Sequence, residues 1–277
     1  MGEPSASPYR ETLPVEVAMP SDITIESVAT GWDSTCAIDS EGQVWCWGDN
    51  SNQKLNVQST DGYVYGPELV EFPNTPHAVE LAVGRHHQCI LDDNSDIYCW
   101  GRNNNGQLGL GNYTSYVRTP TKVDLPSNLV PVSVQARSDF TCMLTTERSV
   151  YCWGQNGGHL GDGTTDNKNR PSQVLLPFTD KASVLSVGYR HSCVLSVDAN
   201  PYCWGNNNYG QLGTKSTWSS PSEHLVPIQI DVFGDVIDIE VGYEHTCALT
   251  RTQSIVCWGL ATTGQLGYGS NTQTTDH

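Results

Sequence analysis

Cysteine is the residue type whose spacing could do chemistry in this chain. All ten cysteines fall into pairs, and each pair is written as a cysteine, nine residues, a second cysteine and then Trp-Gly. The pairs are Cys36 with Cys46, Cys89 with Cys99, Cys142 with Cys152, Cys193 with Cys203 and Cys247 with Cys257. Three chemistries are open to them: metal ligation, free thiols and disulfides. Zinc sites usually place two cysteines about two to four residues apart, which this spacing does not, so the pattern favours disulfides formed in an oxidising compartment.

The segment between paired cysteines is predicted to be a β-hairpin. In residues 36–46, a turn at Ser40-Glu41-Gly42 would place Cys36 opposite Cys46 and Ile38 opposite Val44. Opposed residues of antiparallel strands have α-carbons about 4.5–5.5 Å apart, which lies within the reach of a disulfide. Each pair is therefore expected to close locally, and each bond would add about 2–3 kcal/mol of stability.

Other chemistry is poorly represented. The sequence contains none of the common nucleophile, zinc-protease or phosphate-loop motifs, and the acidic run 92–96 lacks the spacing of an EF-hand. We therefore expect no catalytic residues, no metal site and no cofactor. A formal charge of −16 argues against nucleic-acid partners. It also argues against docking on an anionic membrane, and no apolar run is long enough for membrane insertion.

The elements that must hold these pairs are short strands. Successive Trp-Gly pairs lie 53, 53, 51 and 54 residues apart. Between them are runs of four to seven residues rich in Val, Ile and Tyr, bounded by Pro and Gly, and no useful helical periodicity. About 53 residues suit four antiparallel strands and their turns, which is the size of a propeller blade. The fold class is therefore predicted to be all-β.

Two longer motifs identify the repeat more closely. One is Gly-x-x-His-(Thr/Ser)-Cys-x-Leu, as in residues 188–195 and 242–249, and the other is YCWGNNNYGQLG at 202–213. Together they resemble the RCC1-like (regulator of chromosome condensation) repeat over roughly residues 14–270. The first repeat departs at 50–56 and at Ser34, and the third at Arg137 and Phe140, so their local turns are the uncertain ones.

The resemblance implies a propeller, commonly of seven blades, whereas this chain shows five. We expect a disordered tail at 1–12 and one five-bladed propeller at 13–277, with repeats at 13–66, 67–119, 120–170, 171–220 and 221–277. The run Leu13-Pro14-Val15-Glu16-Val17 matches Pro-x-x-Val segments at Pro120, Pro171 and Pro221. It could supply the fourth strand of the last blade and close the ring. The alternative is a piece of a larger ring.

The tips of the blades are the predicted binding surface. Antiparallel pairing places the Gly-x-x-His tip and the segment after Trp-Gly at the same end of every blade. Trp, Tyr and Arg dominate the energetics of many interfaces, and they recur at these tips. The expected partner-binding residues are Trp32, Asp33, Arg85, His86, Arg102, Asp139, Tyr189, Arg190, Tyr243 and Glu244. The alternative is that they are ordinary loop residues around a water-filled channel mouth.

The repeated histidines and tryptophans have structural interpretations. His87, His191 and His245 occupy equivalent places in different blades, so they would lie around a ring rather than cluster on a metal. We expect each imidazole to hydrogen-bond the backbone of a neighbouring blade. The Trp-Gly tryptophans are expected to be wedges packed between blades.

Together these features predict a non-catalytic recognition module that binds a protein through its loop-rich face. The disulfides predict an extracellular or periplasmic location, although residues 1–8 lack the features of a signal peptide. A glycan-binding propeller is one alternative, but the five tips do not repeat a pocket. Nucleotide exchange on a small GTPase rests on fold analogy alone. An enzyme would require paired carboxylates at the channel mouth, for example Asp33 with Asp139 or Glu244.

Overall fold

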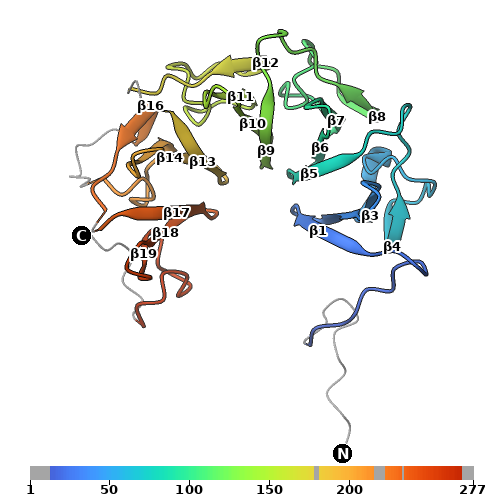
Figure 1. Ribbon diagram of the computed structural model, residues 1–277, viewed down its shortest axis with the longest axis horizontal. Helices are drawn as coiled ribbons and strands as arrows, with labels where there is room; N and C mark the ends of the chain where they lie inside the picture. The colour runs from blue at the N-terminus through green and yellow to red at the C-terminus, as the bar shows by residue number, and fades with distance from the viewer. Residues whose placement is uncertain (1–12, 178–180, 215–221, 233, 270–277) are drawn as a thin grey trace, which may run out of the picture.

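The computed structural model describes residues 13–177, 181–214, 222–232 and 234–269. Five antiparallel sheets stand side by side along an arc, and each sheet is one blade (Figure 1). Within these residues no helix is long and apolar enough to cross a membrane. The sequence-based prediction of an all-β, bladed fold is confirmed.

Four sheets have four strands, and the described part of the fifth has three. Blade 1 contains β1 (Ile25–Thr30), β2 (Ser34–Asp39), β3 (Val44–Asp49), the 3₁₀ turn η1 (Ser51–Gln53) and β4 (Tyr63–Leu69). Blade 2 contains β5 (Ala78–Val83), β6 (His87–Asp92), β7 (Ile97–Arg102) and β8 (Tyr116–Lys122). Blade 3 contains β9 (Pro131–Arg137), β10 (Phe140–Thr145), β11 (Val150–Gly154) and β12 (Lys168–Gln173). Blade 4 contains β13 (Ala182–Val187), β14 (His191–Ser196), β15 (Pro201–Asn206) and β16 (Glu223–Gln229), and blade 5 contains β17 (Val236–Val241), β18 (His245–Thr250) and β19 (Ile255–Gly259).

The disulfide hairpins form as predicted, with Cys36 opposite Cys46 and Ile38 opposite Val44. In all five pairs the α-carbons are 4.1 Å apart. This is closer than the expected spacing of about 4.5–5.5 Å. Each bond joins the two middle strands of one blade, so the covalent staple is local. The bonds join Cys36 to Cys46, Cys89 to Cys99, Cys142 to Cys152, Cys193 to Cys203 and Cys247 to Cys257.

The hydrophobic core lies between blades, and the Trp-Gly tryptophans fill it. The side chains of Trp100, Trp153 and Trp204 are completely buried, which confirms that they are wedges. Each of the last two packs against a glycine of the preceding blade. A Cβ atom built at Gly161, for example, would lie 2.6 Å from Trp204 Nε1. The motif ends in Leu-Gly because the next blade's indole needs that space.

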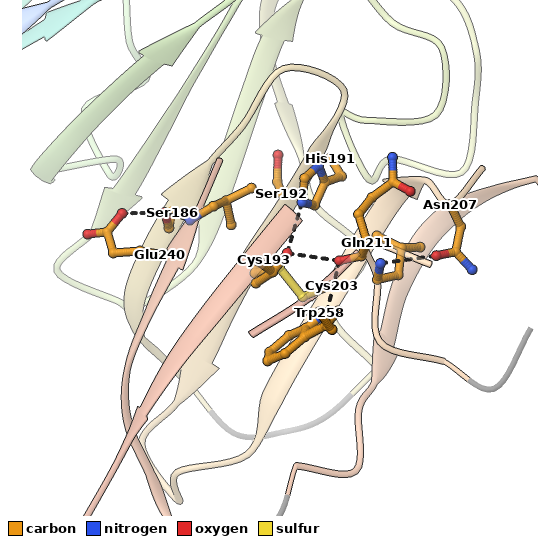
Figure 2. Close-up of a disulfide and its surroundings, with 12 residues drawn as sticks. Ser186, His191, Ser192, Cys193, Cys203, Asn207, Gln211, Glu240 and Trp258 are labelled. Carbon is orange, nitrogen blue, oxygen red and sulfur yellow. Dashed lines mark hydrogen bonds between the residues drawn. A yellow bond between two sulfur atoms is a disulfide. The ribbon is translucent and has the colours of Figure 1, made fainter. Parts of the chain in front are cut away.

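A second set of contacts joins neighbouring blades by hydrogen bonds. His191 Nε2 of blade 4 lies 2.9 Å from Thr246 Oγ1 of blade 5, and this hydroxyl donates to the Gln211 carbonyl at 2.8 Å (Figure 2). Trp258 Nε1 donates to the same carbonyl at 2.9 Å. Since the threonine proton is used for Gln211, the imidazole must donate from Nε2. We call this His–Thr–carbonyl–Trp set, together with the glycine that faces the indole, the blade latch.

The latch corrects one sequence-based prediction. The histidines were expected to bond a neighbouring blade's backbone, but His87 and His191 bond its threonine side chain, at 2.8 Å from Thr141 and 2.9 Å from Thr246. The Gly-x-x-His spacing follows from packing, because a Cβ at Gly84 would lie 2.2 Å from the ring of His87. Where Phe140 replaces the histidine, it packs on His159 with ring centroids 4.8 Å apart.

The described residues form an open ring. The arc leaves a gap between blade 5 and blade 1 (Figure 1), and the predicted closing strand is not formed. Residues 14–20 adopt no regular structure, and the side chains of Leu13 and Val15 are 75% and 66% exposed. The segment lies beside blade 1 (Figure 1) and pairs with no strand of blade 5. The predicted tail at 1–12 and Pro221 lie outside the described residues.

We predict that the space beside the wedge tryptophans limits stability. Gly161 and Gly267 have φ of 72° and 74°, but no heavy atom lies within 4 Å of a Cβ built at Gly267. Gly267→Ala should therefore cost only the left-handed backbone penalty of about 1–2 kcal/mol. Gly161→Ala should cost about 2 kcal/mol more, because Trp204 must move. Urea unfolding with the disulfides intact measures both, and equal losses would contradict the wedge.

We also predict that stability falls in mild acid. Burial lowers the pKa of His87 and His159 to about 4 and that of His191 to about 3. Because the unfolded chain binds protons first, near pH 6.5, stability is lost as the pH falls from 7 toward 4. Each of these three histidines should lower the free energy of unfolding by about 2 kcal/mol at pH 5 relative to pH 7. Urea midpoints at pH 7, 6 and 5 test this. In His191→Gln the loss of stability between pH 7 and pH 5 should be smaller by the share of that one histidine. A wild-type midpoint that does not change with pH would contradict the prediction.

Candidate functional site

In every blade, the Gly-x-x-His tip and the segment after Trp-Gly lie at the same end of the sheet, as predicted. In every blade, the carbonyl of the second variable tip residue accepts a backbone hydrogen bond from the segment after Trp-Gly. The five bonds, 2.7–2.9 Å long, run from Asp49 to Asp33, Arg102 to His86, Gln155 to Asp139, Asn206 to Arg190 and Leu260 to Glu244. The two sets of loops therefore form one surface, held by the strands beneath it.

Aromatic side chains from three blades stack on this surface. The rings of Trp32 and Tyr189 are nearly parallel, at 7°, with centroids 6.2 Å apart. Tyr189 stacks in turn on Tyr243, with centroids 4.1 Å apart and planes at 12°. These residues belong to blades 1, 4 and 5. The stack therefore joins blade 1 to two blades that are distant from it in sequence.

Two arginines extend the stack. The guanidinium carbon of Arg85 lies 3.8 Å from the ring centre of Trp32, and that of Arg190 lies 5.1 Å from Tyr189. Both distances are within the range of cation–π attraction. We call Trp32, Arg85, Tyr189, Arg190 and Tyr243 the aromatic stack.

The aromatic stack combines order with exposure. Trp32 and Tyr243 are 48% and 47% exposed although their neighbours hold them in place. Burial raises the pKa of Tyr243, and a hydrogen bond with Tyr189 raises it further. The phenol is therefore neutral near pH 7. Rigid, half-exposed aromatic rings with guanidinium groups beside them suit recognition.

The remaining predicted binding residues have different surroundings. Asp33 is exposed and Glu244 half-buried, at the tips that carry Trp32 and Tyr243. Arg102 is half-buried in the second set of loops. Asp139 is only 6% exposed, and its carboxylate accepts a hydrogen bond from Gln107 Nε2 at 3.2 Å. Its role is therefore to hold the loops together, and it offers little surface to a partner.

The cysteines take no part in the tip surface. Cys99 and Cys152, for example, lie in the middle of β7 and β11 and are completely buried among the apolar side chains between blades. Their sulfur atoms are bonded to Cys89 and Cys142, and the described residues include no free cysteine. These residues therefore stabilise the scaffold and offer neither a reactive thiol nor a contact to a partner.

A buried ion pair lies beside the stack and was missed from the sequence. Lys54 is 1% exposed, and its Nζ atom lies 2.5 Å from Asp49 Oδ2 and 3.3 Å from Nδ1 of the predicted residue His86. Burial raises the pKa of Asp49, but hydrogen bonds from Lys54 and Ser51 outweigh it and lower the pKa below its usual value. Burial and the Lys54 charge both lower the pKa of His86.

The sequence feature that could have indicated this ion pair is the departure of residues 50–56 from the repeat. Lys54 stands where Gln107 and Gln211 stand in blades 2 and 4, and Asp49 lies five residues before it. The turn still forms, because Asn56 takes the glycine position with φ of 51°. Asparagine tolerates this left-handed conformation better than most residues do.

No group of three or more His, Cys, Asp or Glu side chains that could hold a metal occurs in the described part of the chain. The Nε2 atoms of His87 and His191 instead bond the hydroxyl groups of Thr141 and Thr246. The tip surface presents aromatic faces, guanidinium groups and carboxylates.

Disulfide-stapled blades with such a tip surface define a propeller-type repeat protein. Residues 11–277 match the family model of the RCC1-like domain, and the chain belongs to this family. It is 28% identical to the ultraviolet-B receptor UVR8 of Arabidopsis thaliana over 275 residues, which is 98% of this chain and 60% of that receptor. The chain thus spans less than two thirds of this relative.

Solved structures show the same fold. Human WBSCR16 matches with a TM-score of 0.84 and 22% identity, over 95% of this chain and 67% of that one. Yeast RCC1 (Prp20), solved bound to Kap60, matches with a TM-score of 0.73 and 20% identity, over 88% of this chain and 58% of that one.

Proposed function

We propose that this chain is a non-catalytic recognition module that binds a protein partner through its blade tips. The aromatic stack carries this proposal, because it is a half-exposed, prearranged surface of aromatic and arginine side chains. Holding these side chains in place before binding reduces the entropy lost in the complex. Binding needs only the shared tip surface and does not depend on closure of the ring by Leu13–Val17.

Relatives support a protein as the partner. The yeast relative was solved bound to the protein Kap60. A second description of Prp20p concerns its binding to Gsp1p and histones. These partners belong to that protein, and what passes to this chain is the class of interaction.

The net charge of the chain indicates which kind of protein surface it would bind. With a formal charge of −16, the chain attracts basic surfaces over long range and repels acidic ones. Asp33 and Glu244 would orient such a partner while the aromatic rings supply contact area. The proposed partner is therefore a protein with a basic surface, and its association should slow as salt is added.

The disulfides support an extracellular or periplasmic location. Eight of the ten cysteines are completely buried, so their bonds are structural elements of the core. Structural disulfides persist in oxidising compartments and are rare in the cytosol. A cytosolic exchange activity is incompatible with that location.

Mutation of the aromatic stack tests the proposal. The bait is the chain itself beside the triple variant Trp32→Ala/Tyr189→Ala/Tyr243→Ala, in native extracellular material. A protein that binds this surface should bind the triple variant at least about tenfold more weakly than the unchanged chain. Its association rate with the unchanged chain should fall as the salt concentration rises from about 50 to about 300 mM.

A matched control uses exposed apolar side chains at the opposite end of the blades. Val197 follows β14 and Ile255 begins β19, and they are 49% and 72% exposed, so Val197→Ala/Ile255→Ala should bind like the unchanged chain. Equal affinity of the triple variant and the unchanged chain would show that another surface binds. Release of the captured material by free sugar would show a glycan-binding propeller instead.

A further inference from the structure

One glycosylation motif lies in the loop between β7 and β8. Residues Asn112-Tyr113-Thr114 are the only Asn-x-Ser/Thr sequence of the chain. This sequence is the acceptor of N-linked glycans in exported proteins, where the sugar is attached to the asparagine side chain. A three-residue motif often matches by chance, so the surroundings of Asn112 decide whether it is suited to carry a glycan.

The motif is open to solvent and lies next to the outermost strand of blade 2. The loop follows β7, which ends at Arg102, and leads into β8 at the outer rim of the arc (Figure 1). Asn112, Tyr113 and Thr114 are all exposed. The Tyr113 hydroxyl donates to the Asn167 carbonyl of blade 3 at 3.0 Å and so anchors the loop. A glycan on Asn112 would therefore extend into solvent from an anchored loop without entering the core.

The fold relies on the oxygen of the Asn112 side chain. Oδ1 accepts hydrogen bonds from the backbone amide and the hydroxyl of Thr114, at 3.2 and 2.9 Å, and from Asn103 Nδ2 at 2.9 Å. Among the described residues, Nδ2 donates only to the Leu110 carbonyl, at a long 3.4 Å. A glycosylated amide keeps one N–H, so this contact can persist. The atom that would carry the sugar is thus not needed to hold the loop.

The repeat does not require an asparagine at this place. Counted three residues on from the Leu-Gly of each turn, the residue is Asn112 in blade 2 but Thr164, Ser216 and Ser270 in blades 3, 4 and 5. An aspartate also supports such a turn: in blade 3, Asp162 Oδ1 accepts from the amide and the hydroxyl of Thr164 at 3.0 and 2.8 Å. The nitrogen of Asn112 is therefore a feature of blade 2 that neither the repeat nor the turn explains.

We propose that Asn112 is the attachment site of an N-linked glycan. This inference rests on the extracellular or periplasmic location in the proposed function, and it is independent of the tip surface. Structural disulfides require an oxidising compartment, and the export that takes the chain there also brings it to the glycan donor.

The donor is an oligosaccharide joined through its first sugar to a lipid diphosphate. Nδ2 of Asn112 attacks the anomeric carbon of that sugar and forms a C–N bond. The bond from this carbon to the diphosphate oxygen breaks, and the lipid diphosphate leaves with the electron pair. Nδ2 gives up one proton to a base of the transferase.

Secretion of the full chain tests the proposal. The chain follows a cleavable secretion signal in a eukaryotic host, and its intact mass is measured before and after treatment with a peptide-N-glycosidase. The secreted chain should exceed its polypeptide mass of 30.3 kDa by one glycan and should lose this excess on treatment. Because the glycosidase leaves aspartate where it removes a glycan, the treated chain should then have the mass of the variant Asn112→Asp.

Matched variants separate the glycan from the fold. Asn112→Asp keeps the oxygen that accepts from Thr114 and should carry no glycan. Thr114→Ala should also carry none, whereas Thr114→Ser should keep it. All of these chains should form the same five disulfides, which alkylation before and after reduction measures.

Two results would overturn the proposal: an unmodified Asn112 in the secreted chain, or an N-linked glycan on the variant Asn112→Asp. Neither result bears on the location in the proposed function. Free cysteines in the secreted chain would contradict that location instead, and the state of Asn112 is read in the same way whether or not the disulfides form.

Discussion

The contact between neighbouring blades is the constraint on which the rest of the structure depends. A blade is a small twisted sheet whose two faces are largely apolar, and it cannot bury them alone. The latch solves this with a few residues: an indole wedged against a glycine, and a buried histidine that donates to the next blade's threonine. Because the disulfides stay within single blades, they stiffen the blades but leave the arrangement of the arc to these noncovalent contacts.

The candidate site is a product of that arrangement. Trp32, Tyr189 and Tyr243 belong to blades 1, 4 and 5, and they meet only because each interface fixes the direction of the next blade. The tips differ in sequence while a wedge tryptophan recurs in every blade, so recognition can vary without altering the scaffold. A stack built in this way has little freedom left to lose when a partner binds, which is what a recognition surface requires.

The sequence predicted the parts of the fold that repeat. The cysteine spacing gave the hairpin register, and the Trp-Gly period gave five blades with their tips on one face. Contacts that depend on the curvature of the arc could not be predicted from the sequence. No local pattern pairs Trp32 with Tyr189, which lie 157 residues and three blades apart. Single departures from the repeat were also misjudged. Asp139 appeared to be a surface tip residue but is buried, and Lys54 appeared to be a disrupted turn but forms an ion pair. Pattern likewise suggested a closing strand at 13–17, yet the rotation between blades decides whether it can reach blade 5.

Hydrogen exchange in a chain that lacks one latch hydroxyl tests the central claim most directly, namely that the latch positions the recognition surface. Thr246→Val removes both the acceptor of His191 and the donor to Gln211 while keeping the size of the side chain. The account predicts faster amide exchange across the blade 5 tip, residues 242–245, and unchanged exchange at the blade 2 tip, residues 84–87, whose His87–Thr141 hydrogen bond is not altered. Unchanged exchange at both tips would contradict it, because the blades would then hold their positions without the latch.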